Sequence, residues 1–193
     1  MRIVGGRHRG RRLEAPSGRD TRPTSDRTRE ALFNVLAHSG WGTAAEDGNG
    51  DPIAEARVLD AFCGTGALAL EALSRGAAEA VLMDLSGPAL AAARRNAEAL
   101  DEDGRCAFLR ADARRPPAAA AAATLAFLDP PYGKGLAEAA LPALAARGWL
   151  ASGAVVVVET AAQDPLSPPA DFVPLDDRRY GDTRVVFLEY RPG

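Results

Sequence analysis

The run Asp129-Pro130-Pro131-Tyr132 is the part of this chain best suited to chemistry. It follows the apolar residues 125–128, and a strand cannot keep pairing through two prolines, because proline has no N–H to donate. The strand therefore ends in a stiff turn that holds a carboxylate, a carbonyl without a ladder partner and an aromatic ring. Two acceptors and a ring suit a flat substrate that carries an NH2 group. The turn predicts chemistry on a planar amine or amide nitrogen, with Asp129, Pro130 and Tyr132 as catalytic candidates.

A glycine-bearing loop supplies the second candidate site, because an acid ends an apolar strand just before the loop and a helix begins after it. The two glycines would let the backbone approach a ligand closely, and a helix N-terminus favours an anionic group. The G-x-G spacing followed by Ala69 remains compatible with a dinucleotide fingerprint. An acid directly before the loop would repel a pyrophosphate, however, and suits the amino group of an amino-acid-like cofactor. The predicted cofactor-binding residues here are Asp60, Phe62, Gly64 and Gly66.

Two further acids follow the next two expected strands. Asp84 closes a strand, at a place where an acid typically takes ribose hydroxyls, and Asp112 follows the third strand, where it could take an adenine amino group. Each acid alone is also compatible with a simple cap at a strand or helix end. Three acids at the ends of three successive strands fit one nucleoside-plus-amino-acid cofactor, S-adenosylmethionine, better than three unrelated caps.

The elements that must position these residues alternate between strands and helices from residue 57 onward. We expect helices at 67–75, 89–100 and 138–146, and strands at 58–59, 80–83, 107–109, 124–128, 155–158, 177–180 and 184–190. The continuous β-branched run 155–158 is typical of a strand buried on both faces. Strands separated by helices predict an α/β fold with a doubly wound, mostly parallel seven-stranded sheet. The last two strands should close it as a hairpin, with the final strand antiparallel.

The N-terminal part differs in character from the remainder. Residues 1–13 predict a short β-hairpin, and we therefore divide the chain into a basic extension, residues 1–21, and a main domain, residues 22–193. A proline, two hydroxyl residues and an acid at 23–26 predict a helix start. That helix should run to about His38 with an apolar stripe of Ala31, Leu32, Val35 and Leu36. Residues 42–52 predict a surface loop.

Composition narrows the class of protein. The chain has 193 residues, 47% of them apolar and 25% charged, which fits one globular domain. Two cysteines and two histidines make a disulfide framework or a zinc cluster improbable, so we expect no metal. No apolar stretch reaches the ~18 residues of a membrane helix, and no secretory signal opens the chain. These features predict a cytoplasmic enzyme without a membrane partner, which we expect to be a monomer.

Charge is unevenly distributed along the chain. The net charge is −3, yet residues 1–30 hold nine arginines against four acids, so the remainder carries −8. A basic head on an acidic body suggests a partner that is polyanionic at one end. A solvated arginine-rich tail is the alternative interpretation.

The motifs around Asp60, Asp84 and Asp129 resemble those of class I methyltransferases that modify exocyclic nitrogens. The N-terminal blocks 1–6, 9–13 and 22–34 resemble, more specifically, the RsmD-type 16S rRNA (guanine(966)-N(2))-methyltransferases, where the figure is an RNA position. The resemblance covers nearly the whole chain. It implies a Rossmann-like fold, S-adenosylmethionine as cofactor and methylation of a guanine N2 amino group in small-subunit rRNA. Asp84 stands where the family often has Glu, and the segments 42–52 and 118–123 leave the loop contacts with RNA open.

Methyl transfer to a guanine amino nitrogen predicts roles for individual residues. The Asp129 carboxylate and the Pro130 carbonyl would accept the two N–H bonds of the target amine, and Tyr132 would stack on the base. Thr24 and Ser25 would lie near the cofactor. Arginines at the rim would hold rRNA phosphates, and the candidates are Arg7, Arg9, Arg11, Arg12 and Arg22.

Without the resemblance, the residues leave several functions open. The Asp-Pro-Pro-Tyr turn serves guanine N2, adenine N6 and a glutamine amide equally, because all three present a planar NH2. A non-catalytic ribosome assembly factor with a decayed cofactor site is a rival of another class. An NAD-dependent oxidoreductase is a more distant one.

Overall fold

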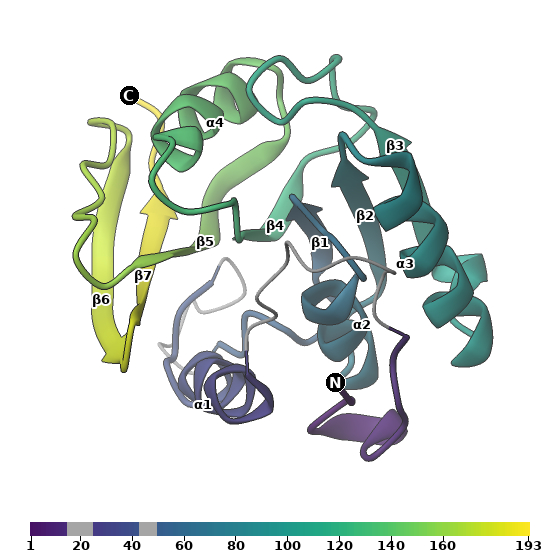
Figure 1. The fold of residues 1–193 in the computed structure, drawn as a ribbon. Helices are drawn as coiled ribbons and strands as arrows, with labels where there is room; N and C mark the ends of the chain where they lie inside the picture. Colours follow the sequence, from purple (N-terminus) through teal and green to yellow (C-terminus); the bar gives the residue numbers. More distant parts are fainter. Residues whose placement is uncertain (15–24, 43–49) are drawn as a thin grey trace.

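The computed structural model describes residues 1–14, 25–42 and 50–193. Seven strands form one sheet in the order β3-β2-β1-β4-β5-β7-β6 (Figure 1). The strands are β1 (Arg57–Ala61), β2 (Glu79–Asp84), β3 (Cys106–Arg110), β4 (Ala123–Leu128), β5 (Leu150–Ala161), β6 (Phe172–Tyr180) and β7 (Thr183–Tyr190). The α-helices of the described residues are α1 (Asp26–Ala37), α2 (Ala67–Ser74), α3 (Gly87–Ala99) and α4 (Leu136–Ala146). Two 3₁₀ turns occupy Gly6–His8 and Asp103–Arg105.

The sheet is parallel from β3 through β5, and β7 is antiparallel to both of its neighbours, β5 and β6. The predicted doubly wound sheet with a final antiparallel strand is therefore confirmed. The strand order reverses between β1 and β4. In open α/β sheets, ligands bind outside the carboxyl ends of the strands at such a reversal.

Hydrophobic cores cover both faces of the sheet. One core joins α1, α2 and α3 to the sheet, and the other joins it to α4 (Figure 1). Along β5, Val155 and Val157 belong to the first core, while Val156 and Val158 belong to the second. This alternation confirms that the β-branched run is buried on both faces, because successive side chains of a strand point to opposite sides.

Helix α1 begins where the sequence predicts and ends one residue before His38, but its buried face is different. Ser25 caps it, with its hydroxyl oxygen accepting a bond of 3.0 Å from the Thr28 amide. The residues fully buried on α1 are Arg29, Leu32, Phe33 and Leu36. Of the predicted stripe, Leu32 and Leu36 are buried and Val35 packs against the core, whereas Ala31 is only half-buried. The observed stripe follows the i, i+3, i+4, i+7 spacing of a helix face, and a charged residue occupies its first position.

The N-terminal segment doubles back on itself, but not through two continuous strands. A single bridge joins Arg2 to Arg12, and the turn between them is a 3₁₀ turn. Ile3 and Leu13 are buried in the core shared with α1 to α3. At Gly6, whose φ is +69°, a Cβ would lie 1.9 Å from the Ser74 carbonyl oxygen. The turn therefore rests directly on the end of α2. Of the predicted 42–52 loop, residues 43–49 lie outside the described residues.

Candidate active site

The parallel register brings the carboxyl ends of four neighbouring strands to one edge. Ala61 of β1 pairs with Met83 of β2 and with Leu128 of β4, and Leu128 pairs with Val158 of β5. The next residue on each strand therefore joins one row at the reversal of strand order. That row consists of Asp84, Phe62, Asp129 and Glu159.

The glycine-bearing loop lies over the end of β2. The amides of Phe62 and Cys63 donate to the Met83 carbonyl at 2.9 and 3.0 Å. At Gly66, whose φ is +78°, a Cβ would lie 2.6 Å from Leu82 Cδ2, so any other residue would strain the backbone and displace the Leu82 side chain. At Gly64, whose φ is +54°, a Cβ would meet nothing within 4 Å. The loop thus leaves open space at its first glycine, where a ligand could approach the backbone.

Asp60 lies beneath this loop and is only 1% exposed. Its Oδ2 accepts a hydrogen bond of 3.1 Å from the Ala69 amide in the first turn of α2. The pKa of Asp60 is raised to about 7, mainly by burial and to a lesser extent by the nearby charge of Asp84, against the opposing effect of the Ala69 bond. The carboxylate therefore stabilises the junction between the glycine-bearing loop and α2 from the interior of the protein. Its predicted contact with a cofactor amino group stays a prediction.

Asp84 holds the loop from the side of β2. Its Oδ2 accepts from the Gly64 amide at 2.9 Å, and its Oδ1 accepts from the Ser86 amide at 2.8 Å. A carboxylate offers about four lone-pair positions, so Asp84 keeps capacity to accept ribose hydroxyls. Leu85, which sequence reasoning passed over, follows directly and is 61% exposed. An exposed large apolar side chain beside two polar loops offers a surface for a flat ring.

Asp112 lies just beyond β3 and has a charged partner. Arg114 donates two bonds to its carboxylate, at 3.0 and 2.7 Å. The side-chain bond from Arg114 lowers the pKa of Asp112, so the group is ionised at neutral pH. A ligand amine would meet Asp112 already in this ion pair.

The Asp-Pro-Pro-Tyr turn leads from β4 toward α4, and its tyrosine is tied to the neighbouring strands. The Tyr132 hydroxyl donates to Glu159 Oε1 at 2.6 Å and lies 3.3 Å from the Thr183 hydroxyl oxygen. Glu159 is 5% exposed, whereas Tyr132 is 37% exposed. Burial, followed by the Glu159 bond, raises the pKa of Tyr132, so the hydroxyl remains a neutral donor. The turn therefore presents an aromatic ring whose far end is fixed.

A cavity of about 300 Å³ opens beside this turn. Its lining includes Pro130 and Tyr132 of the turn together with Glu159, Thr160 and Asp164. The Thr160 hydroxyl is buried and has no hydrogen-bond partner among the described residues. Asp129 is half-buried next to the cavity rather than in its lining.

Sequence reasoning missed Glu159 and Thr183. Glu159 lies near the end of a buried strand, as Asp60 and Asp84 do, and that shared position was a usable signal. Thr183 carried no comparable signal, because β7 reaches the site only by inserting between β5 and β6.

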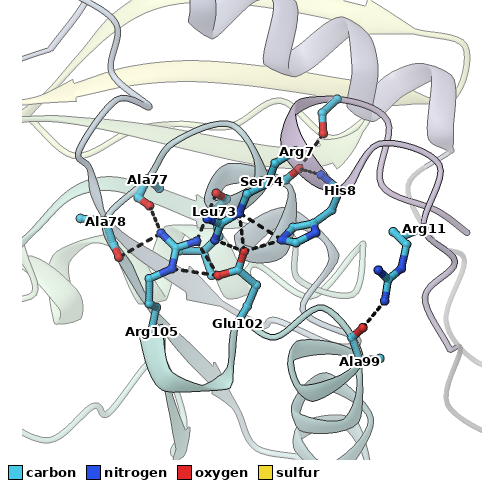
Figure 2. Close-up of polar contacts among 11 residues, drawn as sticks. Arg7, His8, Arg11, Leu73, Ser74, Ala77, Ala78, Ala99, Glu102 and Arg105 are labelled. Carbon is cyan, nitrogen blue, oxygen red and sulfur yellow. Dashed lines mark hydrogen bonds and ion pairs between the residues drawn. The ribbon is translucent and has the colours of Figure 1, made fainter.

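The predicted RNA-binding arginines divide into two groups. Arg7 and Arg11 are bound to the body of the protein, through the Glu102 carboxylate and the Ala99 carbonyl respectively (Figure 2). Arg9 and Arg12 are exposed, and their guanidinium groups make no hydrogen bond or ion pair with the described residues. Arg22 and Thr24 lie outside the described residues. Ser25 is observed as the cap of α1.

Glu102 is the centre of the cluster in Figure 2 and is fully buried. Its carboxylate accepts hydrogen bonds from Arg7 of the N-terminal turn and from Arg105 of the 3₁₀ turn before β3, and the His8 ring lies 2.6 Å away. Although burial opposes it, the bonds from Arg7, Arg105 and His8 lower the pKa of Glu102. The carboxylate is thus kept charged inside the protein, and Arg7 contributes to that.

Two further buried groups fasten the N-terminal segment. Glu71, also fully buried, accepts from the Val4 amide at 2.8 Å and from Arg75 at 2.7 Å. The Asn96 side-chain amide donates to the Thr65 carbonyl at 3.0 Å and exchanges two bonds with the backbone of Glu14. The same amide therefore contacts the glycine-bearing loop and the end of the N-terminal segment.

In the part of the chain that the structure describes, no helix is long and apolar enough to cross a membrane. The described residues likewise include no group of three or more His, Cys, Asp or Glu side chains that could hold a metal ion.

Comparison with known proteins gives concordant results. The model of the family described as Conserved hypothetical protein 95 matches residues 1–189. The chain is 36% identical to the ribosomal RNA small subunit methyltransferase D of Escherichia coli K12, over 86% of this chain and 77% of that protein. It is 31% identical to the putative rRNA methyltransferase YlbH of Bacillus subtilis, over 99% and 100% of the two chains. Among solved structures, it resembles the putative methyltransferase yhhF of E. coli, with a TM-score of 0.81, 32% identity and coverage of 100% and 99%.

Proposed function

We propose, from the premise that the chain belongs to the RsmD family of ribosomal RNA small subunit methyltransferases, that it methylates the N2 amino group of a guanine in 16S rRNA. The methyl donor is S-adenosylmethionine, and the substrate is the small ribosomal subunit or its precursor. The observation that carries the proposal is the register at the sheet edge. It sets Asp129, which begins the Asp-Pro-Pro-Tyr turn, beside Phe62, which begins the glycine-bearing loop.

The residues present fit S-adenosylmethionine. The open space at Gly64 admits a ligand against the backbone, Asp84 retains lone pairs for ribose hydroxyls, and Leu85 offers an exposed apolar surface. Bound there, the cofactor would supply a methyl group on a sulfonium, ready for transfer to a nucleophile. Phe62, Gly66 and Asp112 complete the proposed set. Asp60 supports it from below by holding the start of α2.

The chain's own groups would position the target nitrogen. The guanine amino nitrogen is a poor nucleophile, because its lone pair is delocalised into the ring. The Asp129 carboxylate and the Pro130 carbonyl would accept its two N–H bonds and direct the lone pair toward the donor. Orientation of this kind can contribute about 7–11 kcal/mol to catalysis at best. The base must leave its stack to enter, at a cost of a few kcal/mol.

The basic head would supply the contacts with RNA phosphates. Arg9 and Arg12 are the residues best placed for this, because both are exposed and neither guanidinium is bound to the described part of the protein. Phosphate contacts position a protein on RNA without reading its sequence. The choice of one guanine would then come from the shape of the particle. We further propose that the enzyme acts as a monomer in the cytoplasm, where small subunits are assembled.

Transfer of labelled methyl groups to small subunits tests the function directly. Subunits from a strain that lacks the gene should accept one methyl group per particle, and nuclease digestion should return it as N2-methylguanosine. Recovery of N6-methyladenosine would show that the target is adenine, and label in protein glutamine would show that it is a glutamine amide. Either result would contradict the proposed substrate. An absence of incorporation with retained cofactor binding would favour a non-catalytic assembly factor.

A further inference from the structure

Glu159 is the one acid in the row at the sheet edge that has no place in the proposed cofactor or target contacts. It lies two residues before the end of β5 and is nearly buried. A buried carboxylate is costly unless it is hydrogen-bonded. It accepts a hydrogen bond from the hydroxyl of Tyr132, whose ring the proposed function places against the base.

The contact fixes the orientation of the tyrosine ring. An aromatic side chain anchored at one point, at Cα, can still swing about its two torsions. A bond of 2.6 Å from the hydroxyl to Glu159, with Thr183 Oγ1 at 3.3 Å, adds an anchor at the opposite end of the ring. Glu159 belongs to β5 and Thr183 to β7, which pair in the interior of the sheet. The anchor is therefore rigid, although the turn that carries Tyr132 is exposed.

The cavity shows why this orientation matters. Tyr132, Glu159 and Thr160 all line the cavity of about 300 Å³. This volume is at the small end of the range for small-molecule sites, about 300 to 1,000 Å³. A site of that size suits a single planar base. A ring that changed its tilt would narrow or widen the opening for the base.

We infer that Glu159 is a positioning residue that holds the Tyr132 ring, through its hydroxyl, in the orientation that stacks on the target base. The inference rests on the proposed function for the identity of the base. It assigns Glu159 no direct contact with substrate or cofactor. Thr183 assists as a second anchor.

The inference can be tested by measuring kcat for three single variants and one double variant of Glu159 and Tyr132. Glu159→Ala should lower kcat on small subunits about tenfold to hundredfold, since small misplacements at a reacting centre cost that much. Glu159→Gln retains an acceptor oxygen for the hydroxyl and should restore most of the lost turnover. Tyr132→Phe should match Glu159→Ala, and the double variant should be no worse than either, because residues that act through one contact are not additive. Binding of S-adenosylmethionine should stay within about twofold throughout.

Two outcomes would overturn the inference. One is near-normal turnover in Glu159→Ala, and the other is a double variant whose loss is the product of the two single losses. The second would mean that the carboxylate acts on the substrate itself. Glu189→Ala is the control, because it removes a carboxylate paired with Arg191 from the neighbouring strand β7, at the end of the β5–β7 pairing away from Glu159. Thermal unfolding of each variant separates loss of fold from loss of turnover.

A second readout needs no substrate and so judges Glu159 independently of the proposed function. The chain has three tyrosines, so ring-labelled protein should give three resolvable NMR ring signals. The Tyr132 signal, identified by its loss in Tyr132→Phe, should move in Glu159→Ala and stay in Glu159→Gln. Tyr180 and Tyr190 serve as internal references. An unmoved signal in Glu159→Ala would refute the anchor, whereas inactivity of the wild-type enzyme on small subunits would refute only the proposed function.

Discussion

The Ala69 amide donates a hydrogen bond to Asp60 Oδ2 at 3.1 Å, which ties the end of β1 to the first turn of α2. The sequence motif had suggested an acid that faces a ligand. The structure shows an acid enclosed by protein, with its pKa raised to about 7 by burial. The closed environment of this carboxylate gives it a measurable effect on folding.

The stability of the ligand-free protein should depend on pH through Asp60. Its pKa is about 7 in the folded protein, against an ordinary value of 3.8 for an aspartate, so the native state holds the proton more tightly than the unfolded chain. The stabilisation is complete below about pH 4 and is lost progressively as pH rises through about 7. Urea midpoints of wild type and Asp60→Asn between pH 4 and 8 measure it. The wild type should lose stability relative to the variant, and parallel curves would contradict the prediction.

Asp129→Ala should lose methyl transfer by at least about a hundredfold, because a major positioning contact for the target nitrogen is gone. The cofactor contacts lie on other residues, so equilibrium dialysis with S-adenosylmethionine should give wild-type affinity. Asp176→Ala, which removes a carboxylate paired with Arg178 on β6, is the control. Turnover close to wild type in Asp129→Ala would show that Asp129 does not position the target nitrogen.

Arg9→Ala combined with Arg12→Ala should weaken binding to small subunits and flatten its salt dependence. Each lost phosphate contact lowers the slope of log affinity against log salt by about 0.7–0.9, so the pair should lower it by about 1.4–1.8. The melting temperature should not change, since both side chains are exposed. An unaltered slope would show that Arg9 and Arg12 do not contact phosphates.

Arg7→Ala should behave differently from that pair. It removes one of three donors from the buried Glu102 carboxylate, while Arg105 and His8 remain. Loss of a bond to a charged group costs about 1.5–3 kcal/mol, and the remaining donors should keep the loss near the lower figure. Denaturant unfolding measures it. A stability equal to wild type would show that Arg7 is dispensable to the cluster.

Gly64→Ala and Gly66→Ala should fail in different ways. Both residues have positive φ, which costs a side chain about 1–2 kcal/mol. The Cβ of Gly66→Ala would also strike Leu82 and press on Ala93, which adds about 1–3 kcal/mol of overpacking. Gly64→Ala should therefore melt higher than Gly66→Ala, yet bind S-adenosylmethionine poorly because its Cβ enters the open space. Equal melting temperatures would argue against the close approach at β2.

Much of the fold could be predicted from local pattern, because the succession of strands and helices after residue 57, the β-branched run in β5 and the helix-start residues before α1 are short-range signals. The contacts that shape the site could not. The Tyr132–Glu159 bond depends on how β4 and β5 align, and their register shifts between Ala123 and Leu125. The link between Arg7 and Glu102 joins positions 95 residues apart. On α1, the predicted stripe missed Arg29, because a buried arginine is explained only by the partners it finds in space.

Residues 1–14 place backbone and side-chain donors on two carboxylates that are completely enclosed, Glu71 and Glu102. For protein engineering this means that residues 1–14 cannot be exchanged or removed independently of the rest of the protein. A chimera that imports the head of a relative must import acceptors that match it on α2 and before β3. Deletion of the head would leave two acids inside the protein short of donors, so a truncated chain should be judged first by whether it folds.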